Sequence, residues 1–320
     1  MAGITSPIRI SLAMHSEMEI KPCNESKKKL HEKVAIVTGS TYGIGFAIAR
    51  RLAQDGAHVL ICSRKKENVE KAAEQLKDEG LSIYAMQCHV GNKEDRERLV
   101  AKALEVYGKI DILVCNAAVN PFVGPIFDTT EEMWTKQCCE RVWHLHWRKT
   151  HLFHNLMDYT PMKKKTQIFY VHIHIDANEV FHINVISTFF MIKLVAPHIE
   201  KQGGGSIILC SSFIGYIPHP TIGAYAISKT TIFGLTNVLA QAMRFMNVRV
   251  NGLALGLINT SFSEAVLKNP ELASLVIPMG VYRFGEPEEC AGIASFLCSE
   301  DASYINGENI GVTGGLRGRL

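Results

Sequence analysis

The 320-residue chain lacks the features that mark membrane, nucleic-acid-binding or secreted proteins. Its formal net charge is only +3, and its basic residues are scattered apart from short runs at 27–29 and 163–165, which we interpret as solvated surface. No apolar stretch reaches the roughly 18 residues of a membrane span, and the N-terminus has no convincing signal peptide. We therefore expect no membrane span and no nucleic-acid partner.

The nine cysteines also lack a pattern, because no pair has the spacing of a metal site or a redox motif. Several lie inside apolar runs, which predicts reduced, mostly buried thiols in an intracellular protein. The C-terminal Gly-Arg-Leu only approaches a peroxisomal address, so peroxisome, mitochondrion and cytoplasm stay open. Histidine pairs such as His144 and His146 have no carboxylate or cysteine that completes a zinc spacing, so we expect no metal.

What the chain does contain is a regular alternation of short apolar runs and amphipathic segments. The runs predict strands at 33–40, 58–64, 81–90, 110–118, 206–212, 248–255 and 307–315. The segments predict helices at 43–57, 66–80, 93–108, 224–245 and 287–299. A strand–helix repeat with short links predicts an α/β fold with a doubly wound parallel sheet of the Rossmann type in a single domain.

Two parts of the chain fall outside this repeat. Residues 1–32 form a polar, charged lead-in that we expect to be disordered, so the domain is expected to span 33–320. Between about 137 and 179 the alternation stops, and histidine and tryptophan gather there. We interpret this segment as an irregular insertion.

The stretch Thr-Gly-Ser-Thr-Tyr-Gly-Ile-Gly at 38–45 follows the first predicted strand and opens the first predicted helix. Gly39, Gly43 and Gly45 allow a tight turn and a close approach of the backbone to a pyrophosphate, which the helix N-terminus attracts. This context predicts a dinucleotide site. The alternative is a tight turn that binds nothing.

The end of the second strand distinguishes between the two nicotinamide cofactors. A carboxylate there would bind a ribose 2′-hydroxyl, but the chain has Ser63 and Arg64, followed by Lys65. A serine and a guanidinium suit a 2′-phosphate, so we expect NADP(H). The alternative is that Arg64 is an exposed charge without a ligand.

Tyr225 and Lys229, in Tyr-Ala-Ile-Ser-Lys, lie one helical turn apart on the same face. Ser212 ends a predicted strand, and ligands bind outside the carboxyl ends of such strands, so these three side chains should meet near the glycine turn. The stretch 159–163 has the same Tyr–Lys spacing, but it contains a proline and follows no strand. We interpret it as a chance match.

Taken together, these motifs resemble the short-chain dehydrogenase/reductases over about 33–136 and 180–315. Asn116 in Cys-Asn-Ala-Ala and the segment 283–308 add to the likeness, and several phrases resemble NADP-dependent carbonyl reductases also linked to retinoids. The resemblance implies cofactor contacts at Gly39, Ser40, Gly43, Ile44, Gly45, Ser63, Arg64, Asn116, Tyr225, Lys229, Gly256 and Thr260.

The resemblance also implies roles for four catalytic residues. Tyr225 would donate a proton to a carbonyl oxygen. The Lys229 ammonium, together with the charge of the oxidised nicotinamide, would lower the pKa of that phenol, and Lys229 would also hold the nicotinamide ribose. Ser212 would hydrogen-bond the substrate oxygen, and Asn184 would complete a proton relay. The expected activity is NADPH-dependent reduction of small lipophilic ketones, dicarbonyls or retinal. An NAD-dependent alcohol or steroid oxidiser is a further alternative.

The chain departs from the family in three places. The segment 137–179 falls inside the helix that carries Asn184, so the alternative is a catalytically impaired cofactor-binding or interaction protein. It also puts in doubt the homotetramer that the family implies. Leu255 replaces a usual proline before Gly256, which predicts a softer loop, and His89 replaces a usual aspartate near the adenine. The apolar loop at about 257–283 suits a hydrophobic carbonyl compound.

Overall fold

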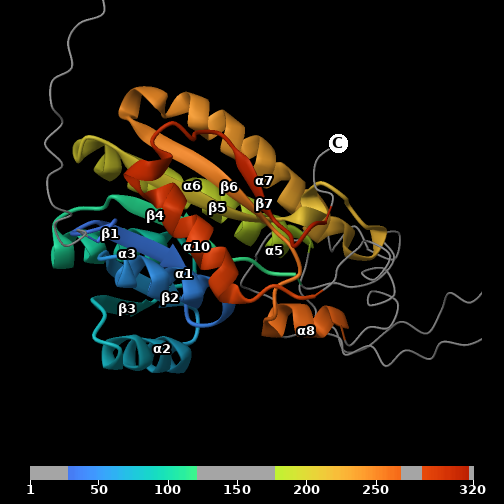
Figure 1. Cartoon of the computed structure of the whole chain (residues 1–320), viewed down its shortest axis with the longest axis horizontal. Helices are drawn as coiled ribbons and strands as arrows, with labels where there is room; N and C mark the ends of the chain where they lie inside the picture. The colour runs from blue at the N-terminus through green and yellow to red at the C-terminus, as the bar shows by residue number, and fades with distance from the viewer. Residues whose placement is uncertain (1–27, 121–176, 268–282, 317–320) are drawn as a thin grey trace, which may run out of the picture.

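A computed structural model of the chain describes residues 28–120, 177–267 and 283–316. Within these ranges seven parallel strands form one sheet in the order β3-β2-β1-β4-β5-β6-β7 (Figure 1). The strands are β1 Val34–Thr38, β2 His58–Ser63, β3 Ile83–Gln87, β4 Ile112–Cys115, β5 Gly205–Ser212, β6 Val248–Leu255 and β7 Asn309–Val312. Because β1 pairs with both β2 and β4, the direction of winding reverses between them. The predicted doubly wound sheet is confirmed.

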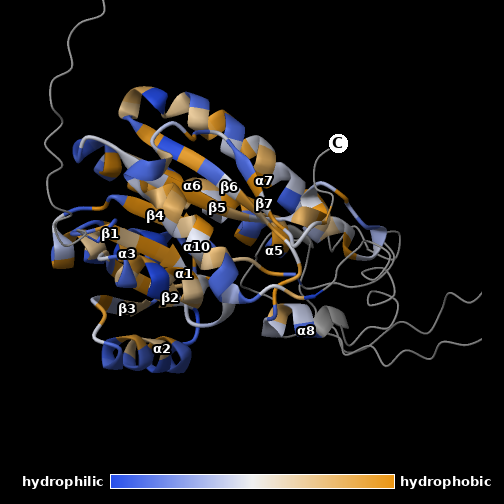
Figure 2. Cartoon of the chain, viewed as in Figure 1, coloured by the Kyte–Doolittle hydropathy of each residue, from blue (hydrophilic) through white to orange (hydrophobic). Residues whose placement is uncertain are grey.

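Eight α-helices occur in the described residues, and six of them cover the two faces of this sheet. The eight are α1 Gly43–Gln54, α2 Lys66–Asp78, α3 Lys93–Tyr107, α5 Ala177–Phe181, α6 Ser187–Lys201, α7 Gly223–Ala242, α8 Ser261–Leu267 and α10 Pro287–Cys298. Helices α1, α2 and α10 pack on one face, and α3, α6 and α7 on the other. In β1, Ala35 and Val37 join the first core and Ile36 joins the second. Burial on both faces explains why the central strands β1 and β4 are nearly continuous apolar runs, coloured orange in Figure 2.

Local signals set where these helices begin and end. Gly108 ends α3 with φ of 74°, a left-handed conformation that glycine adopts without strain. Pro287 stands at the start of α10, where its missing N–H costs no hydrogen bond. There Glu286 and Glu289 form a reciprocal capping box.

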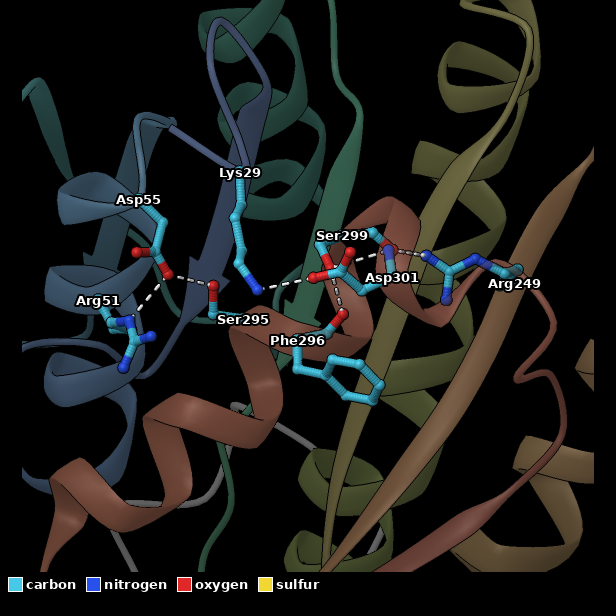
Figure 3. A network of polar contacts seen from close by, with 8 residues as sticks. All are labelled: Lys29, Arg51, Asp55, Arg249, Ser295, Phe296, Ser299 and Asp301. Carbon is cyan, nitrogen blue, oxygen red and sulfur yellow. Dashed lines mark hydrogen bonds and ion pairs between the residues drawn. The ribbon is translucent and has the colours of Figure 1, made fainter. Parts of the chain in front are cut away.

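The last five residues of the predicted lead-in, 28–32, belong to the folded structure. Leu30 is buried in the core that α1 covers, and its N–H donates to the Asp55 carbonyl at 2.9 Å. Lys29 pairs with Asp301 at 2.6 Å beyond the end of α10, and Figure 3 shows this contact beside the one between Asp55 and Ser295. Residues 28–32 therefore differ from the expected disorder of the lead-in, because an apolar side chain anchors them.

The helical run Glu179–Lys201 is longer and more apolar than the sequence analysis expected of any segment in this chain. By length and composition it could cross a membrane, with a mean hydropathy of 1.6. Half of its most apolar window is buried inside the protein, where Ile192 and Val195 pack against the sheet. A core helix that is apolar for this reason gives no independent support for a membrane span.

The predicted burial of unpaired cysteines is confirmed for those that the structure describes, while the intracellular location stays a prediction. All of them are free and buried: Cys62, Cys88, Cys115, Cys210, Cys290 and Cys298. Burial raises the pKa of several of these thiols, to about 12 at Cys290. They therefore behave as small apolar core residues.

Candidate active site

A cavity of about 440 Å³ lies along the carboxyl ends of the central strands. Segments that follow β1, β2, β3, β4, β5 and β6 all contribute to its wall, so residues from distant parts of the chain meet there. The predicted residues that line it are Gly39, Gly43, Ile44, Gly45, Ser63, Arg64, Asn116, Ser212, Tyr225, Lys229, Gly256 and Thr260. Ser40 and Asn184 are not in its lining.

The glycine turn is built so that side chains would not fit. Gly39 and Gly43 have φ of 62° and 57°, a region that other residues rarely adopt. A Cβ on Gly45 would lie 2.3 Å from Nδ2 of Asn116 and 2.4 Å from the Gly39 carbonyl oxygen. Asn116 Nδ2 itself donates to that carbonyl at 2.8 Å, so Asn116 braces the turn from β4. At Gly39, Gly43 and Gly45 the backbone therefore faces the cavity without a side chain between them.

The start of α1 has free capacity for an anion. Tyr42 precedes the helix without forming a side-chain cap, and no acidic residue occurs in the first turn. The first helical residues, Gly43, Ile44 and Gly45, line the cavity. Thr41 Oγ1 is buried with no partner among the residues described. Uncapped N–H groups and the helix dipole at the cavity wall together fit a pyrophosphate, whereas Thr41 is not part of that wall.

Ser40, predicted to contact the cofactor, points elsewhere. Its hydroxyl donates to the Val37 carbonyl at 2.6 Å and accepts from the Cys62 N–H at 3.0 Å. Its own N–H donates to the Cys62 carbonyl at 3.1 Å. Because every one of these groups is used between β1 and β2, Ser40 fixes the turn rather than the ligand.

The cavity continues past the end of β2, where Ser63 and Arg64 lie next to His89. Gln87 at the end of β3 donates to the Arg64 carbonyl at 2.8 Å and so fixes its backbone. Burial, and then the Arg64 charge, lower the pKa of His89. No aspartate or glutamate occurs in the described lining of this cavity.

Ser212, Tyr225 and Lys229 come together as predicted, and all three are buried. Lys229 Nζ donates to the Cys210 carbonyl at 2.9 Å and lies 5.6 Å from the centroid of the Tyr225 ring. The Ser212 hydroxyl accepts from the Ile214 N–H at 3.3 Å, which orients it at the end of β5. The chance match at 159–163 lies outside the residues described.

The electrostatics of this trio are dominated by burial. Burial raises the pKa of the Tyr225 phenol well above its ordinary value, although a hydrogen bond with Ser212 opposes the rise. Burial also lowers the pKa of Lys229 to about 8. Desolvation of a phenolate therefore dominates at this depth in the chain alone, and the lowering by Lys229 together with the charge of an oxidised nicotinamide stays a prediction.

Asn184 is held firmly behind the cavity rather than in its wall. It lies in a π-helical turn, His182–Ile186, between α5 and α6. Its Oδ1 accepts from the Val119 N–H at 2.9 Å, and its Nδ2 donates to the Val119 carbonyl at 3.1 Å and to Ser228 Oγ at 3.0 Å. Residues 177–179 apart, the predicted insertion lies outside the described residues.

The segment after β6 closes the cavity from another side. Leu255, the residue in place of proline, ends β6 and is buried. The Gly256 N–H donates to the Val312 carbonyl at 2.9 Å, and a Cβ on Gly256 would lie 2.8 Å from the Thr313 Cα. Thr260 lies before α8, whose first turn occupies part of the predicted substrate loop.

Sequence reasoning missed two residues of the site. Ser228 joins Asn184 to α7, and its hydroxyl also donates to the Tyr225 carbonyl at 2.7 Å. His219 lines the cavity close to an apolar cluster around Tyr225. Ser228 stands inside the quoted Tyr–Lys motif, but nothing in the sequence pairs it with Asn184. The only sequence signal for His219 as a site residue was its position shortly before that motif.

Comparisons with known sequences place the chain among oxidoreductases. A family model described as short chain dehydrogenase matches residues 33–147, and one described as Enoyl-(Acyl carrier protein) reductase matches 144–317. The two matches meet inside the predicted insertion. Dehydrogenase/reductase SDR family member 4 of Sus scrofa is 46% identical over 297 residues, with 92% of this chain and 91% of that protein covered. Dehydrogenase/reductase SDR family member 2, mitochondrial, of Homo sapiens is 42% identical over 291 residues, with 91% and 88% covered.

A solved structure agrees with the sequence matches. A 7 alpha-hydroxysteroid dehydrogenase complexed with NADH and 7-oxo glycochenodeoxycholic acid superposes with a TM-score of 0.73 at 27% identity. The match covers 92% of this chain and 98% of that one. The similarity therefore extends over the whole sheet.

Proposed function

This chain belongs to the short-chain dehydrogenase/reductase family of oxidoreductases, and on that premise we propose that it is an NADPH-dependent carbonyl reductase acting on lipophilic ketones, dicarbonyls or retinal. The observation that carries the proposal is the buried group of Ser212, Tyr225 and Lys229 beside an uncapped glycine turn in one cavity.

The residues at the other end of the cavity favour the phosphorylated cofactor. The glycine turn and the start of α1 would hold the pyrophosphate, while Ser63 and Arg64 would bind a 2′-phosphate. A carboxylate there would favour a free 2′-hydroxyl, and the described lining has none. When bound, the reduced cofactor would supply the hydride.

The proton chemistry of the chain suits reduction. Tyr225 is protonated at neutral pH and can give its proton to the oxygen of a carbonyl as that oxygen becomes negative. Because burial raises its pKa, this transfer depends on stabilisation of the phenolate. Ser212 would orient the same oxygen. The Lys229 ammonium, present below its pKa of about 8, would stabilise the phenolate that remains.

The wall around Tyr225 favours a lipophilic substrate. Tyr225 packs in a cluster with Phe213, Ile214, Ile222 and Leu257, and its ring centroid lies 5.7 Å from that of Phe262. Such a wall excludes water and strengthens the polar contacts to the carbonyl oxygen. The predicted intracellular location and homo-oligomer stay predictions.

The test is NADPH consumption by the full chain with an aromatic ketone, compared with the Tyr225→Phe variant. We expect turnover in the native chain and a loss of about a thousandfold in the variant, because only the proton donor is removed. NADPH binding, measured by fluorescence titration, should be nearly equal in both. Equal turnover in the variant would refute the role of Tyr225. NADPH binding without turnover in the native chain would instead support the impaired alternative.

A further inference from the structure

His219 stands in the wall of the active-site cavity, in the short connection from β5 to α7. It is half-buried and precedes a single 3-10 turn, Pro220–Ile222, which leads directly into α7 and so to Tyr225. The same cavity has an apolar wall beside Tyr225, formed by Phe213, Ile214, Ile222 and Leu257. Proton transfer at Tyr225 gives the imidazole ring of His219 no role, so its place in this wall needs another explanation.

One ring nitrogen of His219 is committed to the backbone. The Thr221 N–H donates to Nδ1 at 3.3 Å, and the Thr221 hydroxyl contacts the same nitrogen. An amide N–H can only donate, so Nδ1 is the acceptor and the ring proton lies on Nε2. The same bond caps the 3-10 turn and so holds the ring in place.

The second ring nitrogen of His219, Nε2, does not take part in these hydrogen bonds. Nε2 has no hydrogen-bond partner in the part of the chain that the structure describes, although the ring lines the cavity. The ring therefore offers a fixed N–H donor. A donor near an apolar wall is best satisfied by an acceptor on the ligand, and a ligand without that acceptor leaves it unpaired.

We propose that His219 is a specificity-determining residue, whose Nε2–H binds a second acceptor oxygen on the substrate, next to the carbonyl that Tyr225 serves. The proposal rests on the proposed reductase function and narrows its substrates: a vicinal dicarbonyl compound or keto ester is preferred over a plain ketone of the same shape. Tyr225 and Ser212 bind the reacting carbonyl oxygen. His219 favours a substrate that carries a second acceptor oxygen beside it.

The test compares two ketones that differ in one group. Phenylpropanedione has a second carbonyl where propiophenone has a methylene. In His219→Phe, which keeps an aromatic ring but loses the donor, we expect kcat/KM for the diketone to fall about tenfold, mainly through KM. Propiophenone should change by less than about twofold.

Two further variants separate the donor from general effects. In His219→Asn the amide oxygen can accept from the Thr221 N–H while the amide nitrogen donates, so part of the preference should return. His31→Phe makes the same exchange at an exposed position before β1, away from the cavity, and should change neither ketone. A preference for the diketone that persists in His219→Phe, or an equal loss with both ketones, overturns the proposal.

A binding measurement keeps this proposal distinct from the proposed function. Each ketone is titrated by calorimetry into the chain saturated with NADP⁺, where no reduction takes place. If the native chain reduces neither ketone, the reductase proposal fails. His219 then stands as a binding determinant only if His219→Phe weakens the diketone about tenfold and leaves propiophenone unchanged. Any other binding result overturns it.

Discussion

Asn184 Nδ2 donates to Ser228 Oγ at 3.0 Å, and this bond joins the π-helical turn before α6 to the helix that carries Tyr225 and Lys229. The Ser228 hydroxyl in turn donates a hydrogen bond to the Tyr225 carbonyl at 2.7 Å. The sequence raised the concern that the segment 137–179 displaces Asn184. In the structure Asn184 is instead buried and anchored to α7.

Asn184→Ala should destabilise the fold. It removes the partners of the Val119 N–H, the Val119 carbonyl and Ser228 Oγ, all buried. We expect the free energy of unfolding to fall by about 2–3 kcal/mol, measured by urea denaturation. Asn259→Ala is the control. The exposed Asn259 side chain contacts Glu286 at 3.4 and 3.5 Å, and its loss should change stability by less than about 0.5 kcal/mol. Similar losses in both would contradict the structural role of Asn184.

Gly45→Ala should weaken NADPH binding by at least about tenfold, because the added Cβ collides with Asn116 and with the Gly39 carbonyl and must deform the turn. Gly234→Ala is the matched control. Gly234 lies in α7 with no atom within 4 Å of its added Cβ, so this change should raise the free energy of unfolding by about 0.5–1 kcal/mol. Fluorescence titration and urea denaturation measure the two effects. Unchanged NADPH binding in Gly45→Ala would argue against this turn as the phosphate site.

Arg64→Glu should change the cofactor preference. Loss of a guanidinium–phosphate contact should raise the Kd of NADPH about 10–100-fold, while the Kd of NADH changes by less than about threefold. Lys66→Glu makes a similar change of charge at an exposed residue whose partner is Glu70, outside the cavity lining. If both variants weaken NADPH equally, the effect is one of net charge and Arg64 is not a specific ligand.

The rate of reduction should depend on pH through Lys229, whose pKa is lowered to about 8 by burial. Below that pH the side chain is an ammonium ion that stabilises the Tyr225 phenolate, and above it the charge is lost. With NADPH saturating, kcat/KM for a ketone should therefore fall about tenfold per pH unit above about pH 8. Tyr225 stays protonated over this range because its pKa is raised, so it does not add a second fall.

Lys229→Arg gives the control for this profile. A guanidinium stays charged, so the fall near pH 8 should disappear even if the plateau is lower. A native profile that stays level to about pH 10 would show that the charge of Lys229 does not limit the reaction.

The parts of the fold that the sequence predicted are those with local signals. Each strand is a short apolar run because both sheet faces are covered, and Gly108 marks the end of α3 by its own conformational preference. Tyr225 and Lys229 were recognised because one helical turn separates them, and Ser212 because it ends a strand.

The parts that were missed depend on contacts between distant residues. Ser40 was taken for a ligand contact because nothing local shows that its hydroxyl bonds to Cys62 on the neighbouring strand. The partner of Ser228 lies 44 residues earlier in the chain. The direction of the Tyr225 pKa shift follows from burial depth, which a spacing does not reveal.

The order of the strands has a consequence for how the protein is made. β4 pairs with β1 on one side and with β5 on the other, yet β5 begins only at Gly205. On the ribosome, the glycine turn and the first four strands emerge before β5 is made. During that time the edge of the apolar strand β4 lacks its pairing strand. An open parallel edge of this kind is prone to pair with other chains. Slow synthesis between β4 and β5 would therefore favour aggregation, and chaperone binding is most useful during that interval.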